Sequence, residues 1–220
     1  MAFIDTRIDD NCFVLTLQGE GKFNPDSLAA FNQSLDDCLA NEAVQMLVIT
    51  GEGKNFSQGL DLEYLMSADP KQALAFVDEC MLPVGRLLAF PVPVVAAVNG
   101  HAFGLGAMIT LASDYKTMRQ DRGFFCLPEI DMGTPLVERM NRLVIEKLPG
   151  NLLRDVLLTG KRFGGVEACE VGIVDAACAE DQLLATARQL AQPMLGKNRD
   201  ALGALKRGVN IDILSVIEAG

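Results

Sequence analysis

The sequence predicts an α/β fold, because short aliphatic runs alternate with helix-like segments along most of the chain. Met46–Thr50 and Val92–Val98 are continuous apolar runs of strand length, which is typical of strands buried on both faces. Between them, apolar residues recur at helical spacing from Leu74 to Leu88. A length of 220 residues with 50% apolar content suits one domain, alone or with a small helical appendage.

The first quarter of the chain predicts a hairpin followed by a helix. Phe3–Asp9 and Cys12–Gln18 have the composition of two short strands, joined at a turn centred on Asp10. Asn24 is a good helix cap, and Pro25 occupies the first helical position, where its missing N–H costs nothing.

The middle of the chain predicts two further helices and two short strands. A helix opens at Pro70, and Pro83 falls inside its pattern and should kink or divide it. The segment Gly104–Ser113 is apolar on every side, which predicts a fully buried helix. Tyr115–Met118 and Phe124–Leu127 follow as short strands.

The last third is predicted to be mostly helical, with one strand near Ile173–Ala176. The expected helices are Pro135–Lys147, Asn151–Leu158, Val166–Glu170 and Asp181–Gln192.

The charge balance disfavours two classes of partner. The chain carries 19 basic and 29 acidic residues, a formal charge of −10. Nucleic acids and anionic membranes both attract a basic face, so we expect neither as a partner. The long uncharged stretch Leu87–Ser113 is broken by prolines and glycines and does not predict a membrane helix. No basic leader is visible before Asp5, and no signal peptide is expected.

The six cysteines predict free, buried thiols. The closest two, Cys169 and Cys178, are nine residues apart, so there is no CxxC pair for a metal or a redox centre. With a single histidine, a zinc site is hard to build. We therefore expect no metal, and a reducing cytoplasmic location.

Two glycine-rich loops are the strongest chemical signal. Lys54–Leu62 and Val98–Ala107 each follow an aliphatic strand and precede helix-like sequence. Such junctions present unpaired backbone N–H groups, and two of them can form an oxyanion hole. Spacing alone leaves open that the glycines only permit tight turns. A dinucleotide fingerprint fails because Ile109 stands where its third glycine belongs.

Four segments in the same order resemble the crotonase (enoyl-CoA hydratase/isomerase) superfamily. Phe56–Leu62 resembles its first oxyanion motif and Pro93–Gly106 its second; Leu127–Gly133 is similar to its catalytic-glutamate segment, and Leu158–Val174 to its later helical signature. Any one motif is weak, but four in register are specific. The resemblance covers Phe3 to Cys178.

The resemblance implies a spiral of ββα units over residues 1–178, with a C-terminal helical region over residues 179–220 for trimer assembly and cover of the active site. It implies an acyl-CoA thioester substrate and no further cofactor. By motif position, the catalytic groups are the carboxylate of Glu129 and the backbone N–H groups of Leu60 and Leu105. The residues expected to contact the substrate are Lys54, Phe56, Ser57, Gly59, Asp61, Gly104, Gly106 and Met108. Lys206 and Arg207 are further candidates for the phosphates of coenzyme A.

One departure from the family pattern points to a particular reaction. Family members that hydrate carry two glutamates, and Met108 stands at the position of the first. Hydration needs a base for water and an acid for carbon, whereas one carboxylate suffices for a 1,3-proton shift. The sequence therefore resembles the Δ3,Δ2-enoyl-CoA isomerase branch. Another crotonase reaction (hydration, decarboxylation or thioester hydrolysis) and a non-catalytic acyl-CoA-binding protein remain alternatives. Asp61 could also be only the cap of the following helix. Glu129, considered without the motif, could be an ordinary surface carboxylate.

Overall fold

The core of the molecule is a six-stranded sheet in the order β1-β2-β4-β7-β9-β11, seen in a computed structural model that describes residues 2–219. Only the edge pair β1 and β2 is antiparallel, and the other pairings are parallel. The strands are β1 (Ile4–Asp9), β2 (Cys12–Leu17), β4 (Met46–Gly51), β7 (Val94–Val98), β9 (Tyr115–Arg119) and β11 (Ala176–Cys178).

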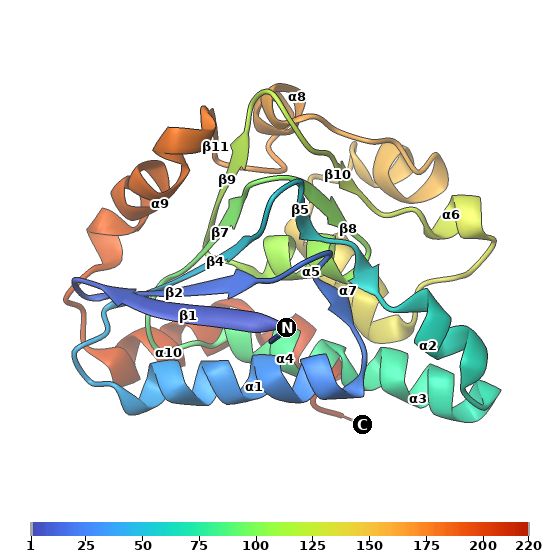
Figure 1. Cartoon of the computed structure of the whole chain (residues 1–220), viewed down its shortest axis with the longest axis horizontal. Helices are drawn as coiled ribbons and strands as arrows, with labels where there is room; N and C mark the ends of the chain where they lie inside the picture. The colour runs from blue at the N-terminus through green and yellow to red at the C-terminus, as the bar shows by residue number, and fades with distance from the viewer. Residues whose placement is uncertain (1, 220) are drawn as a thin grey trace.

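Two small sheets lie beside the main one (Figure 1). One pairs β3 (Lys22–Phe23) with β6 (Gly59–Leu60); the other has the order β10 (Phe125–Cys126), β8 (His101–Phe103) and β5 (Asn55–Ser57). Four times, the chain leaves a strand of the main sheet, forms a strand of a small sheet and then enters a helix. This repetition is the expected succession of ββα units.

Eleven α-helices occur among the described residues. They are α1 (Pro25–Ala40), α2 (Leu62–Ser67), α3 (Pro70–Glu79), α4 (Met81–Leu88), α5 (Leu105–Ala112), α6 (Glu129–Met132), α7 (Glu138–Lys147), α8 (Gly165–Glu170), α9 (Leu183–Ala191), α10 (Arg199–Val209) and α11 (Ile211–Ile217).

Alternating side chains of the parallel strands feed two hydrophobic cores. Leu47 and Ile49 of β4 face the core formed with α1, α4 and α5, whereas Met46 and Val48 face the core formed with α9. Helix α9 covers that second face at one side of the sheet, and α1 runs along the opposite side (Figure 1). Burial on both faces explains why these strands are uniformly apolar in sequence.

The local predictions for the first quarter are confirmed. Asp10 has φ 55° in the hairpin turn, a conformation that short polar side chains tolerate. The side chain of Asn24 accepts from the N–H of Ser27, and the hydroxyl of Ser27 accepts from the N–H of Asn24. With Pro25 at the first position, α1 begins where the sequence predicts.

Several boundaries differ from the sequence prediction. The helix expected to break at Pro83 breaks at Cys80, because a proline is tolerated within the first turn of α4 and not further along. The strand expected near Ile173–Ala176 is Ala176–Cys178, paired to β9. Residues 154–158 of the expected Asn151–Leu158 helix form a π-helix.

The structure agrees with two predictions made from the sequence, that the cysteines are free and buried and that no helix spans a membrane. All six thiols are free; five are buried and Cys169 is partly buried. Burial raises the pKa of Cys12 to about 11 and that of Cys38 to about 12. No helix in the described range is both long and apolar enough to cross a membrane.

A buried ion pair ties the C-terminal helices to the sheet. Lys206 of α10 donates to Asp114 at 2.6 Å, and the same carboxylate oxygen accepts the N–H of Val94 at 2.8 Å. The side chains of Lys206 and Asp114 are only 7% and 16% exposed. Removing one partner of such a pair leaves the other charge in a poorly solvated place.

We expect Lys206→Met to lower the free energy of unfolding by about 3 kcal/mol, because it strands the Asp114 carboxylate. The adjacent Arg207 pairs with Glu218 on the surface, where both side chains are about half exposed. Arg207→Met is therefore the matched control, with a loss of at most about 1 kcal/mol. Urea unfolding of the two variants measures the difference, and equal losses would contradict a structural role for the buried pair.

Candidate active site

Glu129 is the first residue of the short helix α6, directly after β10. The turn is closed by Gly133, which has φ 67° and whose N–H donates to Ile130. The N–H of Thr134 donates to the carbonyl of Glu129 at 3.0 Å. The backbone on both sides of the carboxylate is therefore held in place by hydrogen bonds.

The N–H of Leu105 lies at the start of α5. Its predecessor Gly104 has φ 50° and ψ −117°, a conformation that strongly favours glycine. The N–H of Gly104 donates to Cys126, and its carbonyl accepts from Met108. Among residues 2–219 the N–H of Leu105 donates to no acceptor, as expected for the first turn of a helix.

The N–H of Leu60 lies at the end of the short strand β6. Asp61 donates its N–H to Phe23 of β3 at 2.8 Å. Consecutive N–H groups of an extended segment point to opposite edges, so the N–H of Leu60 points away from β3.

The two loops approach each other so closely that only glycine fits. A Cβ on Gly59 would lie 2.7 Å from the carbonyl oxygen of Phe103 and 3.0 Å from the nitrogen of Leu105. A Cβ on Gly104 would lie 3.8 Å from Oε1 of Glu129. The structure thus brings close together the three chain segments that contain Glu129, Leu60 and Leu105, the residues that the family resemblance implies to be catalytic.

The Glu129 carboxyl sits in a poorly solvated environment. Burial raises its pKa above the usual range, against a smaller lowering by a backbone hydrogen bond. Its Oε2 atom is buried and has no hydrogen-bond partner in the described part of the chain. A raised pKa and a free oxygen are both properties of a group that takes up and returns a proton.

Three residues predicted to contact a substrate are buried in or against the first loop. Phe56 and Ser57 have no exposed surface. The Ser57 hydroxyl donates to Gly21 at 2.6 Å and accepts from Gly59 at 3.0 Å. Gly106 has no room for a side chain, because a Cβ there would lie 2.7 Å from the Cβ of Ser57. Any contact of these residues with a substrate would come from backbone atoms.

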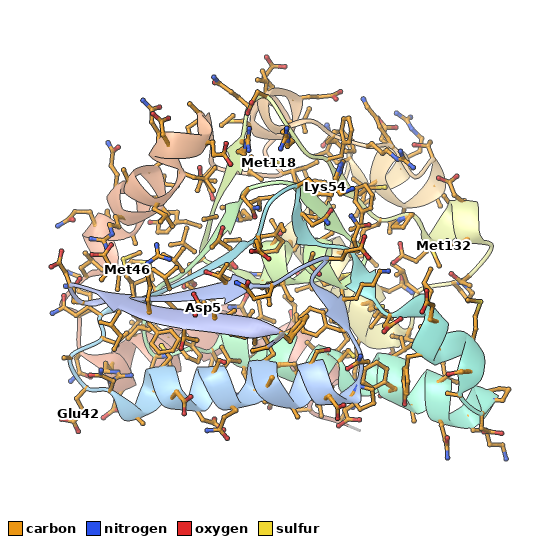
Figure 2. The ribbon with its side chains drawn as sticks, viewed as in Figure 1. Asp5, Glu42, Met46, Lys54, Met118 and Met132 are labelled. Atoms are coloured by element: carbon orange, nitrogen blue, oxygen red, sulfur yellow. The ribbon has the colours of Figure 1, made fainter. Side chains whose placement is uncertain are left out.

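Of three further residues predicted to contact a substrate, Asp61 and Met108 have structural roles, and Lys54 is exposed to solvent. Asp61 caps α2 by accepting from Glu63 and Tyr64, which is the simpler of its two interpretations. Met108 is fully buried within α5. Lys54 is exposed and directly precedes β5 (Figure 2).

The other cations considered for a phosphate group are engaged elsewhere. Lys206 is buried against Asp114, and Arg207 pairs with Glu218. Lys206 is held by Asp114 in this conformation, so the structure gives no support to the expectation that it reaches a phosphate of coenzyme A.

The single histidine lies on an aromatic strip beside the site. The ring of His101 lies 5.1 Å from that of Phe103 and 5.7 Å from that of Phe124. Burial lowers its pKa, with a further lowering by the cations of Arg162, Lys54 and Arg122. These contacts give His101 a packing role beside the two phenylalanine rings.

Asn99 organises the site and was missed in the sequence, where it reads only as a turn residue. Its Oδ1 accepts from Gly51, and its Nδ2 donates to Gly53 and Asn55. One amide thereby fixes the turn between β4 and β5. No local signal reports it, because the partners lie 44 to 48 residues away.

The comparisons with known proteins agree with this geometry. A family model described as enoyl-CoA hydratase/isomerase matches residues 13–218. An Arabidopsis thaliana protein named enoyl-CoA delta isomerase 3 is 38% identical over 172 residues, 75% of this chain and 72% of that protein. Carnitinyl-CoA dehydratase of Escherichia coli (strain K12) is 33% identical over 165 residues, 74% of this chain and 62% of that protein.

A solved structure supports the fold. The crystal structure of an enoyl-CoA hydratase from Mycobacterium ulcerans Agy99 superposes with a TM-score of 0.90 at 25% identity, covering 100% of this chain and 96% of the other. The expected α/β spiral with C-terminal helices is confirmed.

We expect Glu129→Gln to stabilise the fold at neutral pH relative to the native chain. The folded-state pKa of Glu129 is raised, so this carboxyl stabilises the fold below its unfolded pKa, and that contribution is lost as pH rises through the folded pKa. The stability gained by the variant should therefore grow from pH 4 to pH 7.5 in urea unfolding. Glu138→Gln, at an exposed position, is the control. A pH-independent difference would contradict the raised pKa.

Proposed function

Because the chain belongs to the enoyl-CoA hydratase/isomerase family, we propose that it isomerises 3-enoyl-CoA thioesters to the 2-trans isomers. One observation carries the proposal. The Glu129 carboxylate lies beside Gly104, the residue that sets the unpaired N–H of Leu105. The 38% identity to a protein named enoyl-CoA delta isomerase supports the choice of reaction.

In the proposed reaction, Glu129 removes a proton from C2 of the 3-enoyl thioester. The electron pair of the broken C–H bond moves into a dienolate, and negative charge collects on the thioester oxygen. The N–H groups of Leu60 and Leu105 stabilise that charge, aided by the N-terminal dipole of α5. Glu129 then returns the proton to C4, which leaves the double bond between C2 and C3.

The protonation properties of Glu129 favour such a shuttle. A base must hold the proton in the intermediate and release it afterwards, which works best when its pKa is close to the working pH. Burial moves the pKa of Glu129 upward, in that direction. The transfer moves one proton and no electrons into or out of the substrate, so the proposal includes no metal and no redox cofactor.

Hydration or dehydration of an enoyl-CoA is the second candidate. The similarity to carnitinyl-CoA dehydratase favours it. Against it, Met108 occupies the position at which hydratases carry the first of their two glutamates, and it is fully buried. A water molecule would have only Glu129 as its carboxylate anchor. A non-catalytic acyl-CoA-binding protein would bind thioesters without turning any over.

We further propose that the chain assembles as a homotrimer or a dimer of trimers, through its C-terminal helical region. Exposed apolar side chains on α10 support this, with Leu205 69% and Val209 84% exposed. Six free thiols support a reducing compartment, for which we propose the cytoplasm.

The deciding experiment is incubation of the protein with 3-enoyl-CoA and, separately, with 2-enoyl-CoA. We expect formation of the conjugated 2-enoyl thioester from the first, and little hydration of the second. Glu129→Gln should lower isomerisation by about 10²–10⁴-fold, the usual contribution of a positioned base, with thioester binding retained. Glu138→Gln controls for the loss of a carboxylate. Efficient hydration by the native chain would favour the second candidate, and turnover of neither would favour a binding protein.

Gly59→Ala tests the approach of the two loops. We expect turnover to fall by about 10²-fold or more, because the new Cβ collides with Phe103 and Leu105 and spoils one oxyanion donor. Gly53→Ala is a matched control, since Gly53 also has positive φ but nothing within 4 Å of its Cβ position. Equal effects of the two substitutions would mean that backbone strain, and not donor geometry, limits activity.

A further inference from the structure

A cavity of about 300 Å³ lies at the C-terminal end of α5. It is lined by residues of the α5–β9 junction and of α7 and α10, namely Ser113, Asp114, Lys116, Lys147, Leu205, Lys206, Val209 and Asn210. Three of these side chains are cationic and one is anionic, so the lining carries a net charge of +2. This local positive charge contrasts with the net charge of −10 of the whole chain.

The ammonium groups are built into the wall of the cavity. Lys206 is 6% exposed and donates to Asp114 at 2.6 Å. Lys147 donates to the neutral side-chain oxygen of Asn210 at 2.7 Å. Asn210 is itself held by donating to Leu88 and to the carbonyl of Lys206. The described residues thus supply no carboxylate within ion-pair distance of Lys147.

The third ammonium, that of Lys116, is in a long ion pair. Lys116 lies 3.6 Å from Asp175, and its side chain is 17% exposed. Each ammonium has three protons to donate, and the contacts found within the described chain use only part of them.

The ammonium of Lys147 is repelled by the other two cations. Burial lowers the pKa of Lys147 most, the charge of Lys116 lowers it further and that of Lys206 does so less, whereas Asp114 and Glu146 raise it. Burial lowers the pKa of Lys206 as well, although Asp114 acts in the opposite direction. An anion in the cavity would relieve both the repulsion and the desolvation.

We propose that this cavity binds a small free oxyanion of the phosphate class, separate from the thioester site. Ammonium groups bind phosphate as point charges, and Lys116, Lys147 and Lys206 approach the cavity from three different elements.

The cavity is distinct from the candidate active site. Leu105 begins α5 and Ser113 follows its last residue, so the two sites are separated by the whole helix, about 12 Å along its axis. Anion binding there is expected in the absence of any thioester.

The test is a calorimetric titration of inorganic phosphate into the full chain, in chloride buffers of constant ionic strength. Constant ionic strength is needed because phosphate also stabilises proteins non-specifically. We expect saturable binding that Lys147→Gln weakens by about tenfold or more, because a charged hydrogen bond is lost. Lys116→Gln should weaken it in the same direction and covers the case of a poorly folded Lys147 variant. Lys71→Gln, an exposed position on α3, removes the same charge elsewhere and should leave binding unchanged.

Two results would overturn the proposal. One is heat that is non-saturable or identical in all three variants and the native chain. The other is displacement of bound phosphate by coenzyme A, since the phosphoryl group would then be that of the substrate. Phosphate binding that survives saturating coenzyme A supports a separate site, and it does so whichever reaction the enzyme performs.

Discussion

The architecture depends on α5, a helix whose eight residues are all buried and whose first N–H has no acceptor within residues 2–219. A buried backbone donor without a partner is costly, so the surrounding structure has to hold it in place. Gly104 provides the backbone reversal before the helix, and the small Gly106 lets α5 pack directly on Ser57. The apolar faces of the helix are sealed by α4 and α7. The helix therefore delivers one N–H, with the positive end of its dipole, to a fixed point in the interior.

Glu129 is a second polar group that the fold holds in an unfavourable environment, here a carboxylate acceptor where α5 has a backbone donor. A carboxylate that is partly shielded from water loses hydration, and this one has an oxygen with no partner among the described residues. The short α6 turn, closed by Gly133 and Thr134, compensates by fixing the backbone around it. In a chain selected for stability alone this position would favour a neutral side chain. Its ionisable group is understandable as part of a proton-transfer site.

The far end of α5 carries a second electrostatic feature. Asp114 follows the helix, joins the backbone of Val94 to Lys206, and so connects the sheet to α10. The same junction opens into the lysine-lined cavity. One buried helix thus lies between the proposed oxyanion hole, made of backbone N–H groups, and the proposed anion site, made of ammonium groups.

The sequence by itself determined the α/β class, the capped start of α1, the burial of α5 and the free thiols, because each depends on local spacing or on hydrophobic pattern. Family resemblance added Glu129, Leu60 and Leu105, which are 24 to 69 residues apart and carry no local sign of meeting. Only the tertiary structure decided that Ser57 and Phe56 support the loop from inside, that Asn99 ties together three backbone positions of a distant turn, and that Lys206 is held by Asp114. Those roles depend on contacts between residues far apart in the chain, and neither periodicity nor residue type specifies a distant partner. The boundaries of β11 and α4 were shifted for the same reason, since strand pairing and helix packing overrode the local pattern.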